Sequence, residues 1–151
     1  MKAVSQYKGE AQMLKQLSVF LENKAGSICE VAELLRKKNI DVVALCIADT
    51  AKFGILRMVV SDPDAAVELL RGQGQTVSLT DVLVVGIENK PGGMLPALRT
   101  LNEANVGIEY MYAFVGKTKG AYMVLRVENP EKVAEVLKAK GIVCADQSII
   151  G

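Results

Sequence analysis

The sequence predicts an α+β fold made of two successive βαββαβ domains, one over residues 14–80 and one over residues 81–151. The first observation is a repeated turn, because Glu22-Asn23-Lys24-Ala25-Gly26-Ser27 returns 66 positions later as Glu88-Asn89-Lys90-Pro91-Gly92-Gly93. The second is that each copy of the turn follows an apolar run and precedes a helical pattern. A turn that repeats together with its flanking segments indicates two copies of one structural unit.

The first copy contains four segments with the composition of strands and two with the period of helices. Strands are predicted over residues 17–21, 40–48, 53–60 and 76–79. The first helix begins at Ser27, which stands three residues before Glu30 as in a capping box. The second helix begins at Asp62 and Pro63, which suit the N-cap and the first helical position.

The second copy repeats this order of elements. Strands are predicted over residues 82–87, 106–115, 121–127 and 142–145. The buried faces of its two helices are expected to consist of Met94, Ala97, Leu98 and Leu101, and of Val133, Val136 and Leu137. Residues 1–12 lack periodicity and are predicted to be an extension, either partly disordered or an expression remnant, with Met13 as a candidate natural start.

Composition excludes several classes of function. The chain has 151 residues, half of them apolar, and its 18 basic and 17 acidic residues give a net charge of +1. This balance offers no electrostatic case for binding nucleic acid or an anionic membrane, and no apolar run is long enough to span a bilayer. Histidine is absent, which removes the commonest general base and transition-metal ligand.

The three cysteines also bear on where the protein works. Cys29, Cys46 and Cys144 are scattered and lie among apolar residues, so they are interpreted as small buried side chains of a reduced, cytoplasmic protein. We find no nucleophile beside a base, no metal cluster and no phosphate loop. The sequence therefore predicts no catalytic residue, no metal site and no cofactor.

The repeated turn has the residues of a ligand-binding turn. Glycine lets the backbone approach a small molecule closely, and the helix that follows offers unpaired N–H groups to an anion such as a carboxylate. The alternative is a plain connection between strand and helix, in which glycine serves geometry alone. The turn by itself does not distinguish the two interpretations.

The second strand of each copy is apolar on both faces. In the first copy the two faces carry Ile40, Val42, Ala44 and Cys46, and Val43, Leu45 and Ile47. Two short helices per domain cover only one face of a sheet. The other face, or the strand edge, is therefore expected to meet the sister domain, another subunit, or both.

At this point the sequence resembles a tandem pair of ACT domains over about residues 14–145. The resemblance lies in the two βαββαβ units and in the pattern Asn-x-Pro-Gly, which Asn89 to Gly92 match and from which the first turn departs at Ala25. It implies two ferredoxin-like domains that pair side by side through their second strands into an eight-stranded antiparallel sheet with helices on one face. It further implies a free-standing regulatory sensor of amino acids that acts through a partner, such as a metabolic enzyme.

The resemblance implies ligands where a first-strand turn faces the second strand of the other domain. Backbone N–H groups around Gly26 and Gly92 would bind the carboxylate, while Asn23 or Asn89 would contact the zwitterion. The candidate turn residues are Asn23, Lys24, Ala25, Gly26 and Ser27, and Asn89, Lys90, Pro91, Gly92, Gly93 and Met94. Met111, Tyr112 and Ala113 are expected to face the first turn, and Leu45, Cys46 and Ile47 the second.

We therefore expect a protein that binds a free amino acid or a similar small carboxylate and has no turnover of its own. The edges of the two second strands should pair within one chain, and the remaining apolar sheet face should drive a homodimer. A pure oligomerisation module without ligand remains open. An RNA-recognition motif shares the βαββαβ order, but the third strand lacks its stacking aromatics, since Ala121, Met123 and Arg126 stand there.

Overall fold

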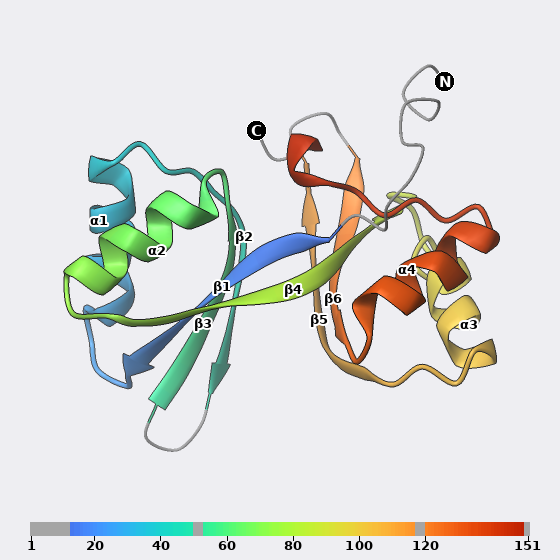
Figure 1. Ribbon diagram of the computed structural model, residues 1–151, viewed down its shortest axis with the longest axis horizontal. Coiled ribbons are helices and arrows are strands. Elements are labelled where there is room, and N and C mark those ends of the chain that lie inside the picture. The colour runs from blue at the N-terminus through green and yellow to red at the C-terminus, as the bar shows by residue number, and fades with distance from the viewer. Residues whose placement is uncertain (1–12, 50–52, 117–119, 150–151) are drawn as a thin grey trace.

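The computed structural model describes residues 13–49, 53–116 and 120–149; the predicted extension at residues 1–12 lies outside them. The described residues form six strands and four helices, in the order βαββα twice over, followed by a short 3-10 helix, η1 (Figure 1). The elements are β1 (Leu14–Glu22), α1 (Ser27–Lys37), β2 (Val42–Asp49), β3 (Phe53–Val60), α2 (Pro63–Gly72), β4 (Thr76–Ile87), α3 (Leu95–Glu103), β5 (Ile108–Val115), β6 (Ala121–Val127), α4 (Pro130–Ala139) and η1 (Gln147–Ile149).

The strands form one antiparallel sheet in the order β2-β3-β1-β4-β6-β5. Its central feature is β4, which is 12 residues long. The first part of β4 pairs with β1, from Thr76 opposite Phe20 to Val82 opposite Leu14, and the second part pairs with β6. One strand therefore serves as the last strand of the first half and the first strand of the second half.

The predicted eight-stranded sheet is wrong for the single chain, because the described residues form six strands. The segments 76–79 and 82–87 merge into β4, since no glycine or proline at Thr80 or Asp81 turns the chain. Residues 142–145 make only an isolated bridge, between Cys144 and Val85. The two second strands, β2 and β5, lie at opposite ends of the sheet and do not pair with each other.

The helices lie outside the two halves of the sheet, α1 and α2 on one side of the molecule and α3 and α4 on the other (Figure 1). Each helix pair covers one face of its own half and encloses a hydrophobic core with it. A third core joins the helix-free faces of both halves, and it consists of Leu14, Ala44, Val59, Val82, Val84, Val124 and Ala145. The apolar face that was expected to drive a homodimer is thus largely buried within the chain.

The C-terminal segment forms another connection between the halves. The Ala145 N–H donates to the Val84 carbonyl at 2.7 Å, which holds the segment against β4. Beyond it, the Gln147 side-chain amide in η1 donates to the carbonyls of Val60 and Ser61 at 3.2 and 3.4 Å. The end of the chain is therefore fastened to the first half.

The repeat extends to backbone details. Asn39 and Asn105 both adopt left-handed conformations, with φ of 55° and 56°, just after the first helix of each copy. The N–H of the following residue then bonds back to the last turn, Ile40 to Leu35 at 3.0 Å and Val106 to Leu101 at 2.9 Å. This arrangement satisfies carbonyls that a helix end leaves without partners.

Two local predictions at the helix starts have different outcomes. Asp62 caps α2 as predicted, since its carboxylate accepts from the Ala65 N–H at 3.1 Å. Helix α1 does begin at Ser27, but the predicted capping box is absent, and Gly26 is the N-cap with no side-chain hydrogen bond. The Ser27 hydroxyl donates instead to the Glu22 carbonyl at 3.1 Å, because the turn brings it back to the end of β1.

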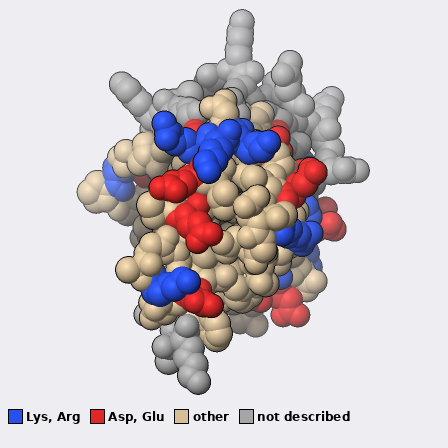
Figure 2. All heavy atoms as spheres, turned by 90° about the vertical axis from the view of Figure 1, so that its left-hand side faces the viewer, with Lys and Arg blue, Asp and Glu red and all other residues tan. Residues whose placement is uncertain are grey.

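The surface agrees with the balanced charge of the sequence. Figure 2 shows acidic and basic side chains interspersed among uncharged ones on the side that carries α1 and α2. None of the described helices is long and apolar enough to cross a membrane. The interpretation of the cysteines as buried is wrong, because Cys29 is exposed on α1 while Cys46 and Cys144 are half-buried.

Candidate functional site

The first turn connects β1 to α1 in a compact hydrogen-bonded bend. The Lys24 N–H donates to the Glu22 carbonyl at 2.8 Å, and the Ser27 N–H donates to the Lys24 carbonyl at 3.5 Å. Gly26 has φ +90°, a backbone conformation that residues other than glycine rarely adopt. The Lys24 ammonium lies 3.4 Å from the Glu22 carboxylate, and both side chains are exposed.

The second turn is built the same way but is tighter. The Lys90 N–H donates to the Glu88 carbonyl and the Gly93 N–H to the Lys90 carbonyl, both at 2.9 Å. Gly92 has φ +78°, and a Cβ added at Gly93 would lie 1.8 Å from the Glu88 carbonyl oxygen. The backbone here leaves no room for the side chain that Ser27 carries at the equivalent position.

Each turn borders a hollow in the surface. The second-turn hollow has a volume of about 590 Å³ and is lined by Ile87, Glu88, Asn89, Lys90, Pro91, Gly92, Gly93, Met94, Ala113, Phe114, Val115 and Ala121. The first-turn hollow has about 310 Å³ and is lined by Phe20, Leu21, Glu22, Lys24, Ser27, Glu30, Phe53, Gly74, Gln75 and Thr76. Each hollow is made by one half of the molecule.

All six candidate residues of the second turn, from Asn89 to Met94, line the second-turn hollow. In the first turn, Lys24 and Ser27 line a hollow, whereas Asn23, Ala25 and Gly26 do not. The candidate turn residues of the second copy therefore all line the larger of these two hollows.

The opposing strands are arranged differently from the expectation. Ala113 of β5 lies at the second turn, in its own half of the molecule, because Val115 pairs with Ala121 and Ala121 pairs with Ile87. Met111 and Tyr112 do not line the first-turn hollow. Leu45, Cys46 and Ile47 of β2 do not line the second-turn hollow. The expectation required β2 and β5 to pair edge to edge, but the two strands are the outer strands of the sheet and meet across the third core instead, where Ala44 of β2 and Tyr112 of β5 both pack.

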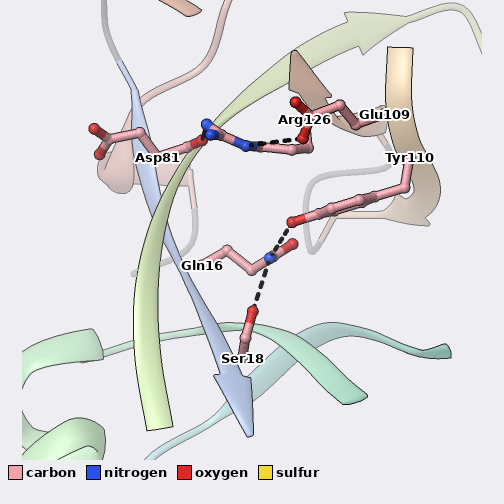
Figure 3. Close-up of polar contacts among 6 residues, drawn as sticks. All are labelled: Gln16, Ser18, Asp81, Glu109, Tyr110 and Arg126. Atoms are coloured by element: carbon pink, nitrogen blue, oxygen red, sulfur yellow. Dashed lines mark hydrogen bonds and ion pairs between the residues drawn. The ribbon is translucent and has the colours of Figure 1, made fainter. Parts of the chain in front are cut away.

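A buried polar cluster joins the two halves where their helix-free faces meet. Gln16 of β1 is fully buried, and its amide nitrogen donates to the Tyr110 hydroxyl at 2.7 Å and to the Ser18 hydroxyl at 3.3 Å (Figure 3). Its amide oxygen accepts from the Tyr112 hydroxyl at 2.6 Å. One amide therefore satisfies both tyrosines of β5, which a buried polar group requires.

The charged side chain of Arg57 packs against this cluster. The Arg57 guanidinium lies 3.7 Å from the centre of the Tyr110 ring, a cation–π contact across the two halves. Burial raises the pKa of the Tyr112 hydroxyl, and it raises the pKa of the Cys46 thiol against the opposing effect of Arg57. Both groups are therefore neutral at physiological pH.

A second pair of contacts lies beside this cluster. Arg126 of β6 lies 3.4 Å from the Glu109 carboxylate and donates to the Asp81 carbonyl at 2.9 Å (Figure 3). Glu109 belongs to β5 and Asp81 to β4, so the guanidinium connects strands on both sides of its own.

A protein-family model described as an ACT domain pair matches residues 12–149. The chain belongs to this ACT domain pair family. No curated protein matches it. Among solved structures, protein BT0572 from Bacteroides thetaiotaomicron is 45% identical, with a TM-score of 0.85, and the match covers 92% of this ACT domain pair and 96% of that chain.

Regulatory subunits of aspartate kinase share the fold of this ACT domain pair at low identity. The subunit from Thermus thermophilus, in a ligand-free form, is 14% identical with a TM-score of 0.58, and the match covers 85% of this chain and 92% of that chain. The subunit from Thermus flavus is 15% identical with a TM-score of 0.57, and the match covers 83% and 90%. These likenesses show the arrangement of the backbone.

Sequence reasoning missed parts of this ACT domain pair. Phe114 and Val115 line the second-turn hollow, but the sequence analysis named neither of them as a site residue. The alternation of β5 places their side chains on opposite faces of the sheet. Gln16 was placed outside the first strand, although a glutamine next to an apolar run is a signal for a buried polar contact. A third hollow of about 450 Å³ was also missed, and it lies between residues 104–109 and residues 128–136.

Proposed function

We propose that this ACT domain pair is a regulatory protein that binds a free amino acid or a similar small carboxylate and acts through an oligomer or a partner. The second-turn hollow carries the proposal, because it brings together a glycine turn, a helix start and a strand of apolar side chains. Small-molecule sites are typically concave and mostly apolar, with a few polar groups that fix orientation.

The backbone of the second turn can bind a carboxylate. The N–H groups of Gly92 and Met94 have no acceptor among the described residues, and both line the hollow. The Asn89 side chain is exposed beside them, and an amide can donate to the carboxylate and accept from the ammonium of an amino acid. Together these groups suit a zwitterion.

The open strand edges support a homodimer. β2 and β5 are the outer strands of the sheet, each eight residues long, and an unpaired edge is a template for another strand. Leu45 and Ile47 on β2 are 53% and 50% exposed, and Val115 on β5 is 61% exposed. Pairing of these edges between two chains would cover the apolar side chains and extend the sheet beyond six strands.

A regulatory role fits the chemistry of the chain better than catalysis. No group of three His, Cys, Asp or Glu residues that could hold a metal occurs in the part of the chain that the structure describes. Two structures with the same fold are titled regulatory subunits of aspartate kinase, which supports a metabolic enzyme as the partner. Three cysteines without disulfides suit the cytoplasm as its location.

A thermal-shift screen with the 20 standard amino acids tests the proposal. A ligand that binds only the folded state at 100 times its Kd adds about 2.7 kcal/mol to the free energy of unfolding, which raises the Tm by several degrees. Asn89→Ala should reduce the shift, whereas the matched Asn23→Ala at the first turn should retain it. If no amino acid or small carboxylate raises the Tm, the ligand-free oligomerisation module is the better description.

A further inference from the structure

The two turns share a backbone plan, but the hollows beside them differ in chemistry. We infer that the chain binds one ligand, at the second-turn hollow only, and that this ligand is a carboxylate with an apolar side chain, as in the branched-chain and aromatic amino acids. The inference rests on the proposed function and adds which turn binds and which chemical class it selects.

The lining of the second-turn hollow is mostly hydrocarbon. Ile87, Pro91, Met94 and Val115 contribute side chains, and two alanines complete the wall. The Phe114 ring lies on the other face of β5, where it stacks on Tyr122. Met94 is 42% exposed and Val115 is 61% exposed, so both have apolar surface that a ligand can cover. An aliphatic or aromatic ligand side chain would remove this surface from water, whereas a charged one would lose hydration without a partner.

The charges at the second turn cancel. Among the described residues that line the hollow, only Glu88 and Lys90 are charged, and they form an ion pair of 2.6 Å. This hydrogen bond with Glu88 also raises the pKa of the Lys90 ammonium, which keeps the pair charged and matched. A carboxylate at the turn therefore meets unpaired N–H groups without net repulsion.

The described residues of the first-turn hollow carry an excess of negative charge. Glu22, Glu30 and Lys24 line it, and Lys24 is paired with Glu22 at 3.4 Å. Glu30 lies in the first turn of α1, where its negative charge opposes the binding of a second anion at the helix start. The residue 66 positions later is Pro96, and the first turn of α3 has no acidic residue.

Size and shape reinforce the difference. The first-turn hollow has about half the volume of the second, and the Ser27 side chain occupies the corner of the turn with its bond to the Glu22 carbonyl. Phe20 and Phe53 add apolar surface there. Negative charge therefore disfavours a carboxylate at the first turn, and the smaller hollow leaves less room beside it for a large ligand side chain.

Titration calorimetry on the full chain tests the inference with L-leucine, L-phenylalanine, L-alanine, L-aspartate and L-lysine as probes. We expect one molecule of leucine or phenylalanine per chain, bound at least about tenfold more tightly than alanine. L-aspartate and L-lysine should bind more weakly still. Two bound molecules per chain, or a preference for a charged side chain, would overturn the inference but leave the proposed function standing.

Matched variants locate the site. Val115→Asp and Pro96→Glu put a carboxylate into or beside the second-turn hollow at exposed positions, so each should weaken leucine binding at least about tenfold. At the first turn, Phe53→Asp adds a carboxylate and Glu30→Gln removes one. Both should leave the affinity for leucine within about twofold. Circular dichroism verifies that each variant is folded. Loss of binding in the first-turn pair alone would assign the ligand to the other hollow, and absence of binding by any probe would contradict both proposals.

Discussion

Gly93 shows how one side chain distinguishes two turns that share a backbone plan. A Cβ added at Gly93 would lie 1.8 Å from the Glu88 carbonyl oxygen. The side chain of the equivalent Ser27 fits, and its hydroxyl donates to the Glu22 carbonyl at the end of β1. The first turn therefore tolerates a side chain that the second turn cannot contain.

Replacing Gly93 with alanine should lower the free energy of unfolding by about 1–3 kcal/mol, because backbone must shift to admit the methyl group. Gly107→Ala is the matched control, since no atom lies within 4 Å of its added Cβ. Urea unfolding followed by circular dichroism measures both variants. Equal stability of the two would show that the second turn is looser than described.

The cysteines should differ in reactivity, because the thiolate is the nucleophile. Burial raises the pKa of the Cys144 thiol from 9.0 to about 11, whereas Cys29 is exposed. At pH 8 iodoacetamide should therefore label Cys29 before Cys144, as mass spectrometry of peptides would show. Labelling of Cys144 first would contradict its burial against the core of the second half.

The same shift affects stability at high pH. The folded pKa of Cys144 lies above the unfolded value, so folding favours the neutral thiol. Its contribution to stability is fully present below about pH 9 and is lost as the pH rises through about 11. Cys144→Ser should flatten this part of the pH profile of stability, measured by urea unfolding between pH 8 and 11.

At the scale of elements, the edge strands β2 and β5 are where the proposed homodimer would form. Lysine on an edge opposes pairing with another strand, and Leu45, Ile47 and Val115 are exposed there. Ile47→Lys and Val115→Lys should each raise the dimer dissociation constant, whereas Glu103→Lys, at an exposed position of α3 away from both edges, should leave it unchanged. Sedimentation equilibrium at micromolar concentration measures this. A wild-type chain that is monomeric at these concentrations would remove the edge-pairing proposal.

The elements themselves were largely readable from the sequence. The predicted strands 53–60 and 121–127 have the observed bounds, because alternation and turn residues are local signals. Whether the chain turns at Thr80 and Asp81 is not a local matter, since Thr80 favours a strand and Asp81 favours a turn. Two predicted strands therefore became one.

For the candidate site, the sequence predicts which turn residues lie together but not which strand faces them. Residues Asn89 to Met94 do lie together at a hollow, because the turn is contiguous in sequence. The wall opposite depends on which strand crosses in front of the turn, and sheet order decides that. The sequence pattern of β5 does not distinguish a strand beside its own turn from one beside the other half.

At the scale of the whole molecule, the two halves should unfold together. They share β4, the third hydrophobic core, and the hydrogen bonds of Gln16 and Gln147. We expect one transition in urea, with coincident curves from circular dichroism and tyrosine fluorescence. Two separated transitions would show that the halves are independent folding units.

Gln16 should contribute strongly to this coupling. Gln16→Leu leaves the hydroxyls of Tyr110 and Tyr112 buried without their partner, at a cost of about 1–3 kcal/mol for each group left unsatisfied. Adding Tyr110→Phe and Tyr112→Phe removes these hydroxyls, so the triple variant should recover part of the loss. A triple variant less stable than Gln16→Leu would show that the tyrosines have other partners.

The uninterrupted β4 also imposes a parity rule on the joint between the two copies. Val77 and Leu79 face the first pair of helices, while Leu83 and Val85 face the second pair, and all four are odd-numbered. Because side chains alternate along a strand, one inserted residue near Thr80 would turn the apolar residues of one half away from its helices. Two inserted residues would keep the phase. A duplication that fuses strands in this way can therefore change length at its joint in even steps, whereas an odd insertion needs a β-bulge or a loop to absorb it.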